Sequence, residues 1–282
     1  MFTTSVIIAT YNRADFLINC LLSLIHQSQL PDEIIISDDG STDDMLDAIR
    51  KILPQIPVKL KFVQQENNGF RLAKVRNNGV RASRGDYLVF VDQDLIFTKN
   101  FIKTFVENRK ENQFCVSYPV RLSATQSDLL DQSIIGQFGF YKFLKKFQRE
   151  KIKKQYRKEY IYYILKKLRL RETGPKLRGG AAAINRSDYF KVNGYDEKYQ
   201  GWGNEDDDMG KRLYRAGVIG KNPFYREFPL HLYHPPHHEN GERINNPYYK
   251  NRVKEIRAGD FRSKYGIENP LDENKFEVTE LN

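Results

Sequence analysis

The chain has 282 residues, of which 29% are charged and 40% hydrophobic, a composition that excludes disordered and fibrous proteins. No apolar run approaches the ~20 residues of a membrane-spanning helix, and the start Met1–Ser5 lacks the basic stretch of a signal peptide. Cys20 and Cys115 each lie in an apolar pattern, so we expect reduced core thiols and a soluble, cytoplasmic protein.

The net charge of +10 is concentrated in one segment. Between Lys142 and Arg178 stand fifteen Lys and Arg against three Glu, a net charge of +12 that leaves −2 for the rest of the chain. Aromatic and aliphatic residues interleave with these cations at spacings of three and four. We therefore expect a basic amphipathic helical insertion, of one or two helices, over residues 140–178. An ordinary solvated helix pair is the alternative.

Short apolar runs alternate with helical patterns along the first hundred residues. Asn12 and the pair Ser41 and Asp44 are candidate caps of the first two helices. This alternation predicts an α/β fold, with a mostly parallel central sheet and helices on both faces. The expected strands are Ser5–Thr10, Glu33–Ser37, Val58–Phe62 and Asp86–Val91, and the helices between them carry Leu17–Ile25, Leu46–Leu53 and Leu72–Val80.

Polar clusters follow three of these expected strands: Thr10–Arg13, Asp38–Asp39 and Asp92–Asp94. Ligands of such sheets bind outside the carboxyl ends of the strands, so we expect a binding site there. The carboxylates of Asp92 and Asp94 can both reach one hard cation, for which Mn²⁺ or Mg²⁺ is suited.

A second cluster, Gly201–Asp208, contains the only Trp of the chain and four consecutive acids. Like charges in a row persist only where a helix N-terminus, a metal or a chemical task offsets their repulsion. Asn204 as a helix cap with the acids on the positive helix end would explain the acids. It would not explain Trp202 or the two flanking glycines, which favours a functional site.

The first hundred residues resemble the family 2 glycosyltransferases. Their hallmarks are T-Y-N-R, D-D-G-S, an A-x-x-R-N-x-G helix and D-x-D, which stand here at 10–13, 38–41, 73–79 and 92–94. The resemblance implies a GT-A fold, a UDP-sugar donor and Mn²⁺ or Mg²⁺. The same resemblance implies that Arg71 or Arg76 lies near the diphosphate. The other residues implied to bind the nucleotide are Thr10, Asn12, Arg13, Asp38, Asp39 and Asp92.

The stretch Gly201–Asp208 resembles the G-W-G-x-E-D motif of inverting β-1,4-galactosyltransferases and chondroitin-type polymerases. The resemblance implies that Trp202, after Gly201, packs on the acceptor sugar and that Asp206 removes the acceptor hydroxyl proton. Glu205 would hold the acceptor or orient this base. Gly180, before an expected strand, would border the donor sugar; a simple bend there is the alternative.

The spacing His231-x-x-His234 resembles the same galactosyltransferase group, in which such a pair completes the metal site that D-x-D begins. His234 is the first candidate and His231 the second, on an expected strand 228–233. A surface turn is the alternative. A structural zinc site is disfavoured because no cysteine pair accompanies the histidines.

We thus expect one GT-A domain over residues 1–258, with a nucleotide-sugar half 1–105, an acceptor half 106–258 and a tail 259–282. The expected function is metal-dependent, inverting transfer from a UDP-sugar to a saccharide or lipid-linked saccharide. By analogy, the Lys142–Arg178 segment would contact the cytoplasmic face of an anionic inner membrane, and no nucleic acid is expected. A nucleotidyltransferase and a non-catalytic saccharide- or nucleic-acid-binding protein are the alternatives.

Overall fold

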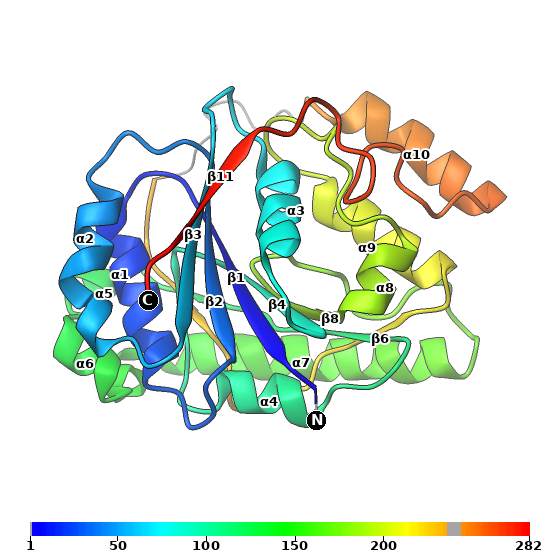
Figure 1. Cartoon of the computed structure of the whole chain (residues 1–282). Helices are drawn as coiled ribbons and strands as arrows, with labels where there is room; N and C mark the ends of the chain where they lie inside the picture. Colours follow the sequence, from blue (N-terminus) through cyan, green and yellow to red (C-terminus); the bar gives the residue numbers. More distant parts are fainter. Residues whose placement is uncertain (1, 236–243) are drawn as a thin grey trace.

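The computed structural model describes residues 2–235 and 244–282. A central sheet carries helices on both faces (Figure 1). Alternate residues of its inner strands supply two cores: Val6 and Ile8 pack on one face, and Ile7 on the other. This period of two is what extended backbone between two layers requires.

The central sheet has eight strands in the order β11-β3-β2-β1-β4-β8-β6-β9. The expected parallel sheet is confirmed in the block β3-β2-β1-β4, whereas β8 pairs antiparallel with both β4 and β6, so the sheet as a whole is mixed. The strands are β1 (Thr4–Thr10), β2 (Glu33–Asp38), β3 (Lys59–Gln65), β4 (Tyr87–Asp92), β6 (Gln113–Val116), β8 (Ala181–Asn185), β9 (Ile219–Lys221) and β11 (Phe276–Glu280).

Three short strands form a second sheet in the order β5-β10-β7. They are β5 (Leu95–Ile96), β7 (Val120–Arg121) and β10 (Leu230–His231). Because β5 begins directly after the 92–94 motif and pairs with β10, this small sheet joins that motif to the distant histidines. The strand expected over 228–233 is thus shorter, since only Leu230 and His231 pair with neighbouring strands.

The helices divide between the two faces. The ranges are α1 (Ala14–Ile25), α2 (Met45–Ile52), α3 (Leu72–Ala82), α4 (Phe101–Glu107), α5 (Ala124–Asp128), α6 (Gln132–Gly136), α7 (Lys146–Lys167), α8 (Arg186–Lys191), α9 (Glu205–Arg215) and α10 (Asn246–Ala258), with 3-10 turns η1 (Leu53–Gln55) and η2 (Gly139–Phe143). In Figure 1, α1 and α2 lie on one side of the sheet, and α3, α8 and α9 on the other. Within residues 2–235 and 244–282, no helix is long and apolar enough to cross a bilayer.

Two expected helix caps are wrong. Arg13, in the left-handed region, occupies the N-cap of α1, while the Asn12 side chain accepts from the Thr42 backbone N–H at 2.9 Å. Ser41 does not form a capping box, because its N–H and hydroxyl both donate to Asp38. Helix α2 begins only at Met45, after Asp44. The T-Y-N-R and D-D-G-S loops are therefore held by each other rather than by their helices.

The expected basic helix exists as α7, but its apolar residues are not gathered on the buried side. Gln148, Ile152 and Glu159 are its buried side chains, whereas Phe147 and Ile161 are 63% and 54% exposed. The polar C-terminal segment, expected as a tail outside the domain, supplies β11, which pairs antiparallel with β3 along the edge of the sheet.

Candidate active site

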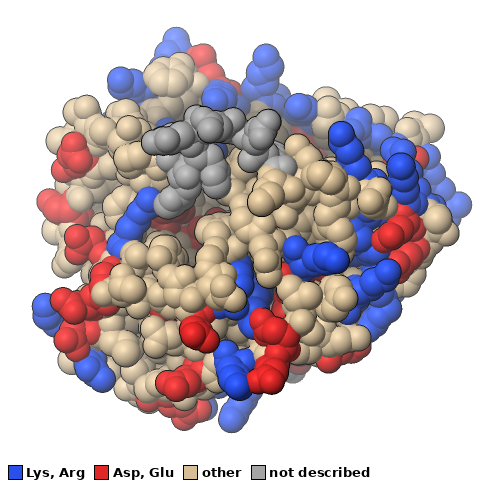
Figure 2. All heavy atoms as spheres, turned by 90° about the horizontal axis from the view of Figure 1, so that it is seen from above, with Lys and Arg blue, Asp and Glu red and all other residues tan. Residues whose placement is uncertain are grey.

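The predicted site residues gather at the carboxyl ends of the parallel strands, the face seen in Figure 2. Lys and Arg are most numerous on the right of that view. Asp38 ends β2 and Asp92 ends β4, while the first turn of α9 supplies Glu205 and Asp206. Four parallel strands thus bring the N-terminal motifs together, as the rule for such sheets predicts.

Asp94, His231 and His234 form a cluster able to hold a metal ion. Their candidate ligand atoms lie within 4.8 Å of one another, and Asp94 Oδ2 is 3.0 Å from His234 Nε2 and 3.4 Å from His231 Nε2. Backbone pairing produces this arrangement: His231 lies opposite Leu95, and the Leu232 N–H donates to the Asp94 carbonyl at 2.9 Å. Both candidate histidines therefore reach the same carboxylate.

The environment of this cluster suits a divalent cation. Asp94 Oδ1 is buried and accepts no hydrogen bond from any residue that the structure describes. Burial opposes ionisation of Asp94, but the His234 hydrogen bond and the neighbouring positive charges lower its pKa overall. Conversely, the hydrogen bond to Asp94 raises the pKa of His234. A carboxylate with two imidazoles is a donor set that Mn²⁺ accepts.

Arg76 joins the strand end to the acidic motif. Its Nη2 is 3.0 Å from Asp92 Oδ1, and its Nη1 is 3.0 Å from Asp206 Oδ1 and 4.0 Å from Glu205. The guanidinium is buried, and these carboxylates together with Tyr195 raise its pKa against the cost of burial. Asp92 is engaged here rather than in the histidine cluster, so its role as a metal ligand stays a prediction.

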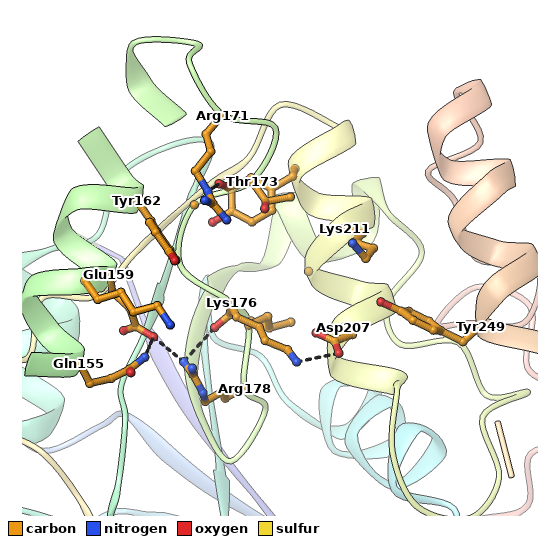
Figure 3. Close-up of a pocket in the computed structure, with 15 residues that line it drawn as sticks. Gln155, Glu159, Tyr162, Arg171, Thr173, Lys176, Arg178, Asp207, Lys211 and Tyr249 are labelled. Atoms are coloured by element: carbon orange, nitrogen blue, oxygen red, sulfur yellow. Dashed lines mark hydrogen bonds and ion pairs between the residues drawn. The ribbon is translucent and has the colours of Figure 1, made fainter. Parts of the chain in front are cut away.

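The four acids at the start of α9 do not face one another. Each residue of an α-helix turns by about 100°, so Asp206, Asp207 and Asp208 each meet a different cation, while Glu205 lies 4.0 Å from the same Arg76 that contacts Asp206. Asp206 contacts Arg76, and Asp208 Oδ2 lies 2.6 Å from Arg212 Nε within the helix. Asp207 pairs with Lys176 at 2.7 Å, as Figure 3 shows. The expected compensation of the charges is thus found for the three aspartates, each of which has a close cationic partner.

Glu205 is the acid whose environment is most unusual. Burial raises its pKa to about 7, and the Asp206 charge adds to this while Arg76 opposes it. Its Oε2 has no hydrogen-bond partner within the described part of the chain. Asn204 precedes it with a positive φ of 79°, and its side-chain amide donates to Asn246 at 3.0 Å instead of capping the helix. The cap interpretation therefore fails for the Asn204 side chain.

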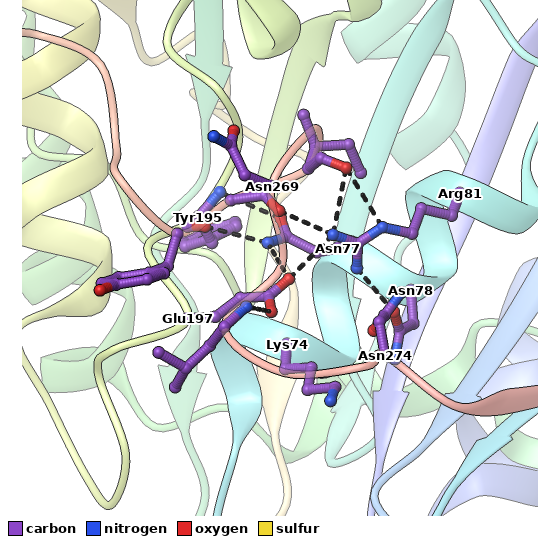
Figure 4. A network of polar contacts seen from close by, with 12 residues as sticks. Lys74, Asn77, Asn78, Arg81, Tyr195, Glu197, Asn269 and Asn274 are labelled. Atoms are coloured by element: carbon purple, nitrogen blue, oxygen red, sulfur yellow. Dashed lines mark hydrogen bonds and ion pairs between the residues drawn. The ribbon is translucent and has the colours of Figure 1, made fainter.

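Tyr195 is a site residue that the sequence analysis missed. Its hydroxyl donates to Asp206 Oδ1 at 3.1 Å, and its ring lies 5.0 Å from the Arg76 guanidinium carbon. Asn77, next to Arg76 in the 73–79 motif, holds the Tyr195 backbone: it accepts from its N–H at 3.0 Å and donates to its carbonyl at 2.9 Å (Figure 4). Tyr195 and Arg76 are thus positioned by the same helix.

Two glycines let the strand β8 approach these side chains. A Cβ on Gly179 would collide with Arg76 and Asp206, and one on Gly180 would collide with Asp92. Gly180 thus lies against the carboxylate at the end of β4, at the edge where the donor sugar was expected. A larger residue at either position would displace a side chain of the site.

The N-terminal loops form the other half of the site. Asp38 accepts from the Ser41 N–H at 2.8 Å and from Gln64 at 3.0 Å. Asp39 accepts from the Arg71 N–H at 2.8 Å and from Gln65 at 2.6 Å, yet burial raises its pKa to about 6. Each carboxylate at the end of β2 is therefore fixed by its own pair of donors.

The remaining predicted residues differ in position. Thr10 is buried, and its hydroxyl donates to Gln93 of the 92–94 motif. Arg71 is also buried, but it contacts Asp39 at 3.9 Å and the C-terminal Asp272 at 3.8 Å, away from the acidic motif. Of the two arginines considered for the diphosphate, Arg76 is therefore the one beside Asp92.

Arg13, Gly201 and Trp202 lie at the surface of the site. Arg13 has a left-handed backbone (φ 59°), and its charge acts on Asp94. Gly201 and Gly203 have φ of 75° and 93°, and Trp202 between them is 41% exposed. Two left-handed glycines thus set the loop in which the indole of Trp202 is partly exposed to solvent.

Comparison with known proteins identifies the fold. Solved structures similar to the chain include GalNAc-T7 with UDP, GalNAc and Mn²⁺ (TM-score 0.60, 17% identity, 91% of this chain and 50% of that one). Another is S. aureus TarS 1-349 in complex with UDP-GlcNAc (TM-score 0.61, 16% identity, 94% and 68%). The fold is therefore that of the GT-A nucleotide-sugar transferases.

Residues 5–190 match the family described as glycosyl transferase family 2, and the chain belongs to that family. Residues 160–235 match the family described as the N-terminal domain of galactosyltransferase, which includes the acidic motif. The enzyme class is therefore that of the glycosyltransferases.

Curated relatives include the chondroitin synthase of Escherichia coli, 28% identical over 242 residues, which are 80% of this chain and 35% of that protein. The validoxylamine A glucosyltransferase of Streptomyces hygroscopicus subsp. limoneus is 26% identical over 230 residues, 76% and 48% of the two chains. The chain thus spans about a third to a half of the length of these relatives.

Proposed function

We propose that the protein is a metal-dependent, inverting glycosyltransferase. It would move a hexose or N-acetylhexosamine from a UDP-sugar to a saccharide acceptor. The product would belong to a bacterial surface polysaccharide or lipopolysaccharide. The observation that carries this proposal is the contact of Arg76 with both Asp92 and Asp206, beside the cluster of Asp94 with two histidines. A candidate base and a candidate metal site thus adjoin one strand end.

The donor class is supported by the neighbours in fold. GalNAc-T7 was crystallised with UDP and Mn²⁺, and TarS with UDP-GlcNAc. In this chain the paired carboxylates Asp38 and Asp39, with Thr10 and Asn12, would hold the uridine. Arg13 and Arg76 would lie toward the diphosphate, whereas Arg71 would support the pocket through Asp39.

Asp206 is the residue that we assign as the base. Among the described residues, Arg76 and Tyr195 both contact its Oδ1, so its Oδ2 is the oxygen that would accept the proton of the acceptor hydroxyl. Two donors on one oxygen fix the orientation of the carboxylate, which general-base catalysis requires. Glu205 would orient the acceptor or the base, and Trp202, after Gly201, would pack against the acceptor sugar.

Asp94, His234 and His231 would hold the cation, with Asp92 as a further candidate, and Gly180 would border the donor sugar. Bound Mn²⁺ or Mg²⁺ would act as a Lewis acid on the charge that develops on the departing UDP. Arg76 would contribute a fixed positive charge at the same edge. The attack of the acceptor oxygen and the departure of UDP would then form a single displacement.

The test is UDP release from a panel of UDP-sugars, with and without saccharide acceptors, at controlled Mn²⁺. We expect release to need the metal, and Asp94→Ala and His234→Ala to weaken Mn²⁺ binding by at least ~10-fold in calorimetry. His26→Ala is the matched control, since His26 lies at the end of α1 and bonds to the Leu22 carbonyl. Full activity in excess EDTA would contradict the metal assignment.

A further inference from the structure

A pocket of about 300 Å³ lies beside the candidate active site. Its walls are α7, the segment 171–178, α9 and Tyr249 of α10, so it depends in part on the basic insertion (Figure 3). The segment packs closely on α9 because Gly210 has no side chain: a Cβ there would lie 3.0 Å from that of Leu177. On the opposite side, Glu159 of α7 forms an ion pair with Arg178 of this segment, with 2.8 Å between Glu159 Oε1 and Arg178 Nη1.

The lining of this pocket carries an excess of positive charge. Five cations line it, Lys158, Arg171, Lys176, Arg178 and Lys211, against the two acids Glu159 and Asp207. Both acids are already paired, with Arg178 and Lys176 respectively. Among the described residues, Lys158, Arg171 and Lys211 have no carboxylate within ion-pair distance.

Two of these cations converge on one aromatic ring. The Arg171 guanidinium carbon lies 3.9 Å from the centre of the Tyr162 ring, and Lys158 Nζ lies 5.6 Å from it. Cation–π attraction offsets part of their mutual repulsion, and a bound anion between the pocket walls would remove the rest. Tyr214 and Tyr249 also line the pocket, and aromatic faces suit the apolar faces of sugars.

The pocket adjoins the proposed base through two separate segments. Asp207, in its wall, follows Asp206 directly in the chain. Arg178, in the same wall, precedes Gly179, where a Cβ would collide with Arg76 and Asp206. Both segments of the pocket wall thus continue directly into residues that surround Asp206.

We propose that this pocket binds an anionic group, a carboxylate or a phosphate, on the acceptor saccharide. The inference rests on the proposed function and makes it more specific, since it names an acidic acceptor. Arg171 offers a planar fork that matches either anion, and Lys211 and Lys158 offer point charges. A pocket walled on several sides suits one group of a saccharide better than a flat membrane surface.

The experiment compares four acceptors: a tetrasaccharide with alternating uronic acids, its methyl ester, a neutral tetrasaccharide and a sugar phosphate. The variant is Arg171→Gln/Lys211→Gln, and the matched control is Lys51→Gln/Lys59→Gln, which removes the same charge at exposed positions across the sheet. Thermal unfolding checks that both variants fold. Calorimetry with each tetrasaccharide measures binding without turnover.

We expect wild type to prefer an anionic acceptor. Arg171→Gln/Lys211→Gln should raise the KM for the anionic acceptor by ~10-fold and leave the KM for the neutral acceptor unchanged. A preference for the uronate or for the sugar phosphate identifies the anion. Equal KM values for the acid and its methyl ester, or equal losses in the control variant, would overturn the inference. If no UDP-sugar is turned over, the proposed function fails, and calorimetry still decides whether the pocket binds the anion.

Discussion

Asp206 is held at the first turn of α9 by two donors from different elements, Arg76 of α3 and Tyr195 before α9. Its neighbours in the chain are engaged elsewhere, Asp207 with Lys176 and Asp208 with Arg212. The sequence motif shows four equivalent acids, but the helical rotation gives each a different environment. At the scale of single residues, the geometry therefore separates Asp206 from its neighbours.

We expect Asp206→Asn to lower transfer by at least ~100-fold, since the amide cannot accept the acceptor proton. UDP binding should be preserved, because Arg76 retains Asp92 as a partner. Initial rates and calorimetry with UDP measure the two effects. Asp207→Asn is the comparison, and it should keep a larger share of activity. Near wild-type transfer by Asp206→Asn would reject this residue as the base.

Glu205 gives a pH prediction. Its pKa is raised from 4.5 to about 7 by burial and by Asp206, so between these values the folded protein holds a proton that the unfolded chain has released. This contribution to stability is present at low pH and is lost as the pH rises toward 7. Glu205→Gln should therefore make the melting temperature less dependent on pH across that window.

Thermal unfolding of the metal-free protein between pH 5 and 8 measures this effect. Glu66→Gln is a suitable control, because Glu66 is exposed and should leave the pH dependence as it is in wild type. An unchanged slope in Glu205→Gln would mean that another group titrates there.

At the scale of elements, α7 is attached to the domain mainly by polar groups. Glu159 is 2% exposed and accepts from Arg178 at 2.8 Å, from Gln155 at 2.8 Å and from Asn222 at 2.5 Å. One carboxylate thus joins the helix to the segment before β8 and to the segment after β9. The apolar side chains that usually fasten a helix are in part exposed here, as Phe147 shows.

Glu159→Ala should therefore lower the free energy of unfolding by ~1–3 kcal/mol, because the buried amide of Asn222 and the partly buried donors of Arg178 and Gln155 lose their acceptor. Chemical denaturation measures the change. Glu150→Ala, at an exposed position on the same helix, should leave stability within ~0.5 kcal/mol of wild type. Equal stabilities of the two variants would show that α7 is held by other contacts.

The inner strands could be predicted because burial on both faces leaves continuous apolar runs, such as Val6–Ile8. The meeting of Asp94 with His231 could not be predicted from periodicity, since it depends on pairing between strands of two residues, and only the family resemblance indicated it. Tyr195 carries no local signal, because its role comes from the distant Asn77 and Asp206. The alternation Phe276-Glu277-Val278 was a weak strand signal that the polar composition concealed.

At the scale of the whole molecule, charge is distributed unevenly: the segment Lys142–Arg178 carries +12, and the rest of the chain −2. The structure exposes apolar side chains within that segment, with Phe147 63%, Ile161 54%, Leu168 62% and Leu170 71% accessible. Exposed apolar residues among cations are typical of surfaces that meet anionic lipid. The anion-binding pocket uses other side chains, Arg171 and Lys211, so the two roles can be separated by mutation.

We predict that wild type binds vesicles with anionic phospholipid and is released as salt rises, because surface attraction is screened over ~8 Å at physiological ionic strength. Replacing Lys151, Lys153, Lys154 and Lys167 by Gln should lower vesicle binding by at least ~10-fold, at ~1 kcal/mol per cation near the surface. Transfer to a soluble acceptor should be unchanged. Cosedimentation and UDP release measure the two effects. If wild type does not bind anionic vesicles but binds single-stranded RNA, the partner of the Lys142–Arg178 segment is a nucleic acid. If the variant loses transfer to the soluble acceptor, α7 belongs to the acceptor site.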